Sequence, residues 1–307
     1  METTIKSKPT KKIQNENGHA LNSHTGSKRL TVQKTYKLYI DGKFPRTESG
    51  RYGKFTDGNG NHLANICRAS RKDLRDSIVS NRKAQHDWAK RTAYNKGQIL
   101  YRIAETLESR KAQFVDVMIQ QGCKTVSANA EVVNAIDALV YYAGWSDKYM
   151  QVFSSVNPVE SSHFNFSYPE PTGVVSLIAE DDSALCGLVS AICPVIVGGN
   201  TCTVLSSEQY PLTAIDFAEV LHASDIPNGV INILTGQRKE LIGHFSSHMD
   251  INAIVYSDLD EAQIKTAQTN AALNVKRVLD FSNDDALTPY RIMACQEIKT
   301  TWHPVGI

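Results

Sequence analysis

The chain has 307 residues, of which 41% are hydrophobic and 21% charged, and its formal net charge is +1. These values are ordinary for a soluble globular protein with one large domain or two ordinary ones. The near-neutral balance gives no global field that would attract nucleic acid or a membrane surface. No apolar run reaches the roughly 20 residues that a membrane span needs. We therefore expect neither nucleic acid nor a membrane as a partner.

The six cysteines show no CxxC pair and no spacing typical of a zinc site. Most of them lie inside apolar runs, where a free thiol acts as a small hydrophobe. The N-terminal segment contains no apolar stretch of the kind found in a signal peptide. These features predict reduced thiols, no metal site and a cytoplasmic location.

The first 34 residues are polar, basic and poor in aromatic side chains. Such a segment cannot bury enough surface to fold, so we expect residues 1–34 to form a disordered tail. It serves either as a solvated linker or as a docking arm for an acidic partner. Order is expected to begin near Tyr36, where Asp41-Gly42 predicts a hairpin turn.

Residues 35–168 are expected to form an N-terminal region of a hairpin and helices. After a strand-like piece at 62–70, Ser70 is suited to cap a first helix that runs through Trp88. Apolar residues from Ile99 to Phe114 recur every three or four positions and predict a second helix. A third is expected over 128–150, and its aromatic cluster is more typical of a core than of a ligand box. Residues 161–168 alternate as in a strand.

Short β-branched runs alternate with helix-like segments from Gly173 onward. The predicted strands are 174–179, 201–205, 229–236, 251–257 and 275–281, and the predicted helices are 184–197, 211–222, 239–246 and 260–272. This alternation predicts an α/β fold, with a Rossmann-like parallel sheet that carries helices on both faces. We assign it to a nucleotide-binding-like domain at residues 169–282.

Four pieces of this region carry a resemblance to a known family: EPTGVVSLIA, PVIVGGNT, SSEQYPLTAIDFAEVL and IPNGVINILTG. Together they resemble the aldehyde dehydrogenase superfamily, most closely the degenerate second module of its two-module sixteenth family. The resemblance covers about 36–280. It implies oxidation of aldehydes to acids with NAD or NADP, by a Cys nucleophile, a Glu-activated water and an oxyanion held by Asn and a backbone N–H.

This sequence departs from the family pattern at the positions where family members contact the reacting groups. Asp182 stands at the position of the oxyanion Asn, and a carboxylate cannot donate a hydrogen bond. The phosphate-turn glycine is replaced by Asp258, and two more acids follow it, which opposes an anionic ligand. By resemblance, the remnants of the cofactor site are Ser207, Glu208, Gly236 and Ser257.

The nucleophile and the general base of the family are also missing. No Glu-Leu-Gly-Gly motif follows the fifth strand, and the family's catalytic Cys domain has no counterpart. Residues 283–307 resemble the family's C-terminal helix and edge strand. Cys295 falls in that helix and is expected to be a structural thiol. Cys186 lies near a helix start, but Asp181 and Asp182 oppose its ionisation. We therefore expect no catalytic residue.

Three functions follow from these observations. The first is a non-catalytic subunit that keeps the fold and forms a homo-oligomer, or a hetero-oligomer with a full-length aldehyde dehydrogenase. In that case residues 300–307 are suited to pair with a partner's sheet. The second is an NAD(P)-dependent oxidoreductase whose thiol comes from a partner chain. The third is a stand-alone binding scaffold whose acidic turns favour a cation or an amine.

Overall fold

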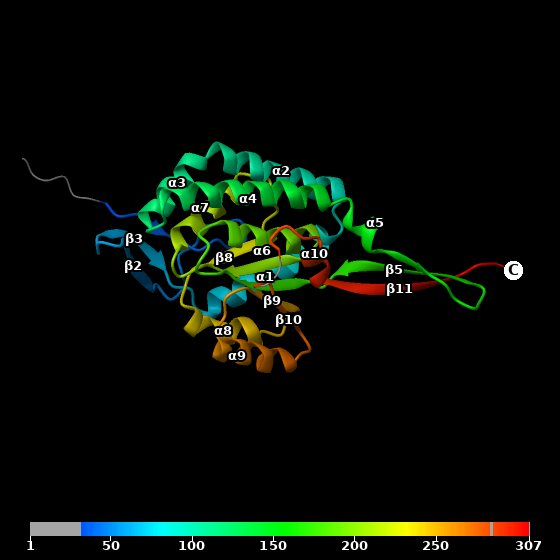
Figure 1. Ribbon diagram of the computed structural model, residues 1–307. Coiled ribbons are helices and arrows are strands. Elements are labelled where there is room, and N and C mark those ends of the chain that lie inside the picture. Colours follow the sequence, from blue (N-terminus) through cyan, green and yellow to red (C-terminus); the bar gives the residue numbers. More distant parts are fainter. Residues whose placement is uncertain (1–31, 283–284, 307) are drawn as a thin grey trace, which may run out of the picture. The chain divides into compact units, whose positions relative to one another are not determined.

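The computed structural model describes residues 32–282 and 285–306 (Figure 1). The tail expected at 1–34 lies almost entirely outside the described residues. Gln33–Ile307 form one compact unit, which contains three sheets. The predicted boundaries at 168 and 282 remain predictions.

The central sheet has five parallel strands in the order β10-β9-β6-β7-β8. Its strands are β6 (Val174–Ile178), β7 (Thr201–Leu205), β8 (Ile231–Leu234), β9 (Ala253–Tyr256) and β10 (Arg277–Asp280). All residues of β6 to β9 are buried, as their continuous apolar runs require in a sheet covered on both faces. The α/β architecture predicted from the sequence is therefore confirmed.

Helices pack on both faces of this sheet (Figure 1). One face carries α1 (Arg71–Ala89), α8 (Arg238–Ser247) and α9 (Glu261–Ala272). The other carries α6 (Cys186–Val197) and α7 (Pro211–His222), with α2 (Ala93–Ser109), α3 (Lys111–Gln120) and α4 (Thr125–Trp145) as a further layer. Ser70 caps α1 in a reciprocal capping box with Asp73, as the sequence predicts.

Two predicted helices are in fact each divided in two. The expected second helix breaks at Arg110, whose backbone leaves the helical region, so Phe114 belongs to α3. The apolar stripe hides the break because both pieces pack against one core. The expected third helix ends at Trp145, and a separate helix, α5 (Tyr149–Phe153), follows it. Its aromatic cluster does lie in the core, around the fully buried Tyr142.

The predicted hairpin is reduced to its turn. Asp41 and Gly42 both adopt positive φ, but a single bridge joins the flanking residues. Tyr39 instead exchanges two backbone hydrogen bonds with Ile233 of β8, at 2.9 and 2.8 Å. A small sheet nearby has the order β1-β3-β2. Its strands are β1 (Thr35–Tyr36), β2 (Tyr52–Thr56) and β3 (His62–Cys67), of which β2 was not anticipated.

The third sheet is an antiparallel arm with the order β11-β5-β4 (Figure 1). Its strands are β4 (Ser155–Asn157), β5 (His163–Pro171) and β11 (Gln296–Pro304), and α10 (Tyr290–Ala294) leads into β11. The helix and edge strand predicted near the C-terminus are confirmed. So is the strand predicted at 161–168, which begins at His163 and continues to Pro171.

Candidate functional site at the carboxyl ends of strands β6 and β9

The strand order of the central sheet reverses between β6 and β9. From β6 the chain proceeds to β7 and β8 on one side and then returns to β9 and β10 on the other. In doubly wound sheets, ligands bind outside the carboxyl ends of the strands at such a reversal. β6 ends at Ile178 and β9 at Tyr256, so the loops that follow these residues flank the expected site.

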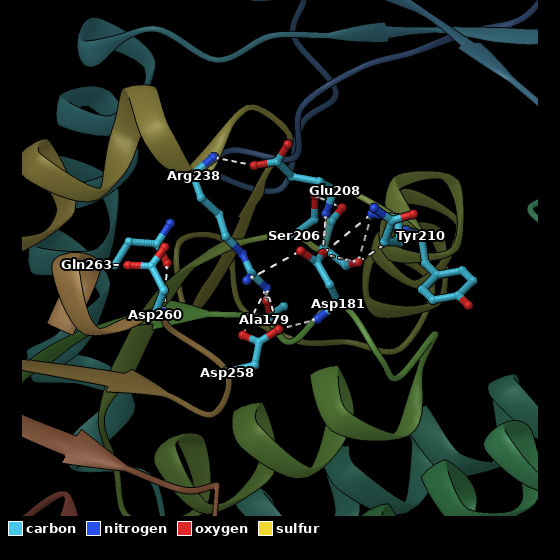
Figure 2. A network of polar contacts seen from close by, with 11 residues as sticks. Ala179, Asp181, Ser206, Glu208, Tyr210, Arg238, Asp258, Asp260 and Gln263 are labelled. Atoms are coloured by element: carbon cyan, nitrogen blue, oxygen red, sulfur yellow. Dashed lines mark hydrogen bonds and ion pairs between the residues drawn. The ribbon is translucent and has the colours of Figure 1, made fainter.

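A buried arginine joins these two loops (Figure 2). Arg238, the first residue of α8, is only 7% exposed. Its Nη1 lies 3.3 Å from Oδ2 of Asp181, and its Nη2 lies 3.0 Å from Oδ1 of Asp258. Nη2 also donates to the carbonyl oxygen of Ala179. The backbone N–H of Asp181 donates to Oδ2 of Asp258 at 2.6 Å, which links the loops directly across the reversal point.

The loop after β7 joins the same network (Figure 2). Oδ1 of Asp181 accepts hydrogen bonds from Ser207 Oγ and from the backbone N–H of Glu208, both at 2.7 Å. Oε1 of Glu208 in turn accepts from the backbone N–H of Arg238 at 2.7 Å. Three strand ends and the start of α8 are thus held together by charge-assisted hydrogen bonds, which are stronger than neutral ones.

The N-terminus of α6 is also occupied by a side chain of this chain. Helix N-termini present free backbone N–H groups that attract anions. Here Oε2 of Glu131, on α4, accepts from the N–H groups of Leu185 at 2.9 Å and Cys186 at 2.7 Å. The same oxygen accepts from Ser183 Oγ at 2.9 Å. An internal carboxylate therefore stands where an anionic ligand would otherwise bind.

A second carboxylate near α6 adds to the negative charge of this region. Glu180 is half-buried, and a Cβ at Gly187 would overlap its Oε1. Burial raises the pKa of Glu180, and the carboxylates of Asp182, Asp258 and Glu131 raise it further. The site is thus arranged to hold acids of its own rather than to receive another anion.

The structure brings some of the predicted site residues together. Ser207 and Glu208 both belong to the Arg238 network, and Gly236 precedes Arg238 by two residues. Asp182 is exposed and makes no hydrogen bond or ion pair with the described residues, and none of the contacts of the Arg238 network involves Ser257. The roles given to these residues remain predictions. Sequence reasoning missed Arg238 and Glu131, although acids gathered at several strand ends indicate a neighbouring cation.

The two cysteines considered as nucleophiles are poorly suited to that role. Burial raises the pKa of Cys186 to about 11, with Glu131 and Glu180 adding to the effect. Burial likewise raises the pKa of Cys295 to about 12. Because the thiolate is the reactive form, neither thiol is activated at neutral pH.

Within 32–282 and 285–306, no group of His, Cys, Asp and Glu is placed to hold a metal ion. No helix in these ranges is long and apolar enough to span a membrane.

Comparison with known proteins gives a consistent set of relatives. The aldehyde dehydrogenase family model matches residues 45–279. The putative aldehyde dehydrogenase DhaS of Bacillus subtilis is 29% identical over 259 residues, which cover 82% of this chain and 52% of DhaS. Cytosolic 10-formyltetrahydrofolate dehydrogenase of Mus musculus is 26% identical over 257 residues, which cover 82% of this chain and 28% of that protein.

Solved structures share the fold. The NAD+ complex of an aldehyde dehydrogenase from Bacillus cereus gives a TM-score of 0.76 at 23% identity, with 80% of this chain and 50% of that chain covered. A betaine aldehyde dehydrogenase variant of Staphylococcus aureus in complex with NAD+ gives 0.75 at 22% identity, with 80% and 50% covered. The chain thus spans about half, or less, of the relatives that it matches.

Proposed function

Because the chain belongs to the aldehyde dehydrogenase family, we propose that it is a non-catalytic member that keeps the fold and associates with a catalytic aldehyde dehydrogenase. One observation carries the proposal. The buried guanidinium of Arg238 holds Asp181 and Asp258 together across the reversal point of the sheet. The loops between which a dinucleotide would bind are therefore bonded to each other.

The residues at this site do not fit a dinucleotide. A pyrophosphate needs backbone N–H groups that are free and a turn that lets it approach closely. Here the N–H of Asp181 is bonded to Asp258, and those of Leu185 and Cys186 are bonded to Glu131. A bound pyrophosphate would have to displace these internal carboxylates, so we derive no hydride-transfer step.

The exposed edge of the arm sheet supports association with a partner. β11 is an edge strand of its sheet within the described residues, and its Ile298 and Trp302 side chains are 55% and 57% exposed. Such a strand is suited to pair with a strand of another chain. We propose a homo-oligomer or a hetero-oligomer formed in this way.

A second candidate function has one observation in its favour. A cavity of about 280 Å³ is lined by Ser207, Glu208 and Gly236, which are three of the predicted cofactor residues. This cavity is compatible with an NAD(P)-dependent oxidoreductase that takes its thiol from a partner. The bonded loops beside it favour the non-catalytic function.

Co-expression of this chain with a complete aldehyde dehydrogenase from the same organism tests the proposal. We expect the two chains to co-elute in size-exclusion chromatography, with a mass from light scattering that fits a hetero-complex. NADH production should come from the partner alone. Trp302→Glu should weaken co-elution, whereas Tyr94→Glu, at a more exposed aromatic site on α2, should not. Elution of the chain by itself, together with NADH production by the isolated chain, would contradict the proposal.

A further inference from the structure

A cavity of about 650 Å³ lies between the start of α1 and the end of α8. None of its lining residues belongs to the Arg238 network. Its volume falls within the range of small-molecule sites, roughly 300–1,000 Å³. The lining residues are Glu48, Ser70, Arg71, Lys72, Leu74, Arg75, His244, Ser247, His248 and Met249.

The lining of this cavity carries an excess of positive charge. Three of its side chains are cationic and one is acidic. Lys72 Nζ lies 3.2 Å from Oε2 of Glu48, so these two charges offset each other. Arg75 Nη2 lies 3.2 Å from Oδ1 of Asp76, so these two charges also offset each other. Arg71 makes no ion pair with the described residues, so its charge remains available.

The exposed guanidinium of Arg71 lies at a helix start, where a positive charge is mildly disfavoured. Arg71 and Lys72 are the first two residues of α1, where the helix dipole opposes positive side chains. The acid of this first turn, Asp73, is already engaged, since its carboxylate accepts from Thr47 Oγ1 at 2.6 Å and from the N–H of Ser70 at 2.7 Å. Among the described residues, Arg71 therefore has no ion-pair partner within α1.

The imidazole of His248 borders the same charges. Burial lowers its pKa, and the cations of Lys276 and Arg71 lower it further, whereas Asp250 raises it. His248 Nδ1 lies 3.3 Å from the backbone N–H of Asp250, which donates to it and leaves Nε2 as the N–H donor of the neutral ring. Lys276 Nζ donates to the carbonyl oxygen of His248 at 2.7 Å.

We propose that this cavity binds a small organic phosphate monoester. Arg71 makes no ion pair with the described residues and favours an anion, and guanidinium groups bind phosphate through several parallel hydrogen bonds. The hydroxyls of Ser70 and Ser247 supply further donors, while Leu74 and Met249 offer apolar contact for the organic part. The proposal is independent of the non-catalytic function, because it uses different residues.

Calorimetry on the full chain at low salt tests the proposal with glycerol 3-phosphate and with inorganic phosphate as probes. We expect saturable binding of the ester with a Kd below about 1 mM. Arg71→Glu should weaken it by about tenfold or more. Lys83→Glu is the matched control, since Lys83 is exposed on the same helix outside the cavity, and it should bind within about twofold of the unaltered chain. Circular dichroism will show that both variants are folded.

Histidine NMR locates the ligand. We expect the ester to shift the ring resonances of His248 and to raise its apparent pKa, and Arg71→Glu should reduce both effects. No saturable heat up to about 10 mM ester would overturn the proposal. Equal binding by the two variants would overturn the location, and equal binding of succinate would overturn the assignment to phosphate.

Discussion

Replacing Arg238 with methionine should destabilise the fold strongly. The change keeps much of the side-chain volume but removes the cation that faces Asp181 and Asp258 at 3.3 and 3.0 Å. Removing one partner of a buried ion pair costs about 3–5 kcal/mol, because an uncompensated charge remains. The two carboxylates are 31% and 25% exposed, and water will stabilise them in part. We therefore expect a loss near the lower limit, about 3 kcal/mol, which corresponds to a fall in Tm of about 5 °C.

Thermal and guanidinium unfolding of the purified chain will measure this loss. The matched control is Arg102→Met, which removes a half-exposed pair with Glu105 on α2 and should change stability by no more than about 0.5 kcal/mol. Adding Asp181→Asn and Asp258→Asn to Arg238→Met should restore most of the lost stability, since no buried charge is then unpaired. Equal Tm values for Arg238→Met and Arg102→Met would refute the reasoning.

Three other predictions concern single groups. Burial lowers the pKa of Lys96 to about 8 from 10.5, and its one hydrogen bond within the described residues goes to the carbonyl oxygen of Ala89 at 3.3 Å. The folded pKa of Lys96 lies below its unfolded value, so burial of the charged amine lowers the stability of the fold at pH 7. Lys96→Met should therefore stabilise the chain at pH 7 by on the order of 3 kcal/mol, measured by denaturant titration. This gain should shrink as the pH rises towards 10.5. Burial and neighbouring acids raise the pKa of Glu180, so the fold loses stability as the pH rises through the folded pKa. Glu180→Gln should therefore have a higher Tm than the unaltered chain at pH 7. A difference in Tm between the two that stays constant from pH 4 to 7 would be inconsistent with this. The double variant Asp182→Asn, Asp258→Gly should produce no NADH from aldehydes in a spectrophotometric assay, because neither Cys186 nor Cys295 is activated. Steady NADH production without a partner would contradict this.

Much of the fold could be predicted from local sequence patterns. The apolar runs at 174–179 and 201–205 predicted buried parallel strands because strands covered on both faces cannot alternate. Ser70 marked the start of α1 because a hydroxyl is the preferred cap for the first free N–H groups. The helix break at Arg110 could not be predicted, because the apolar stripe continues through it when both helices pack on one core.

Only part of the candidate site could be predicted from the sequence. The acids at the strand ends could be identified from their positions after the predicted strands. Their charge partner could not, because Arg238 reaches Asp181 and Asp258 only once three βα units have folded together. The contact of Glu131 with the start of α6 depends in the same way on the packing of α4 against α6, which no local pattern specifies.

Isothermal titration of the chain with NAD+ and with NADP+ tests the central claim most directly. If the loops of β6 and β9 are held closed by Arg238 and the start of α6 by Glu131, neither dinucleotide should give saturable heat up to about 5 mM. A Kd below about 1 mM for either one would show that the site accepts a cofactor, and it would contradict the account.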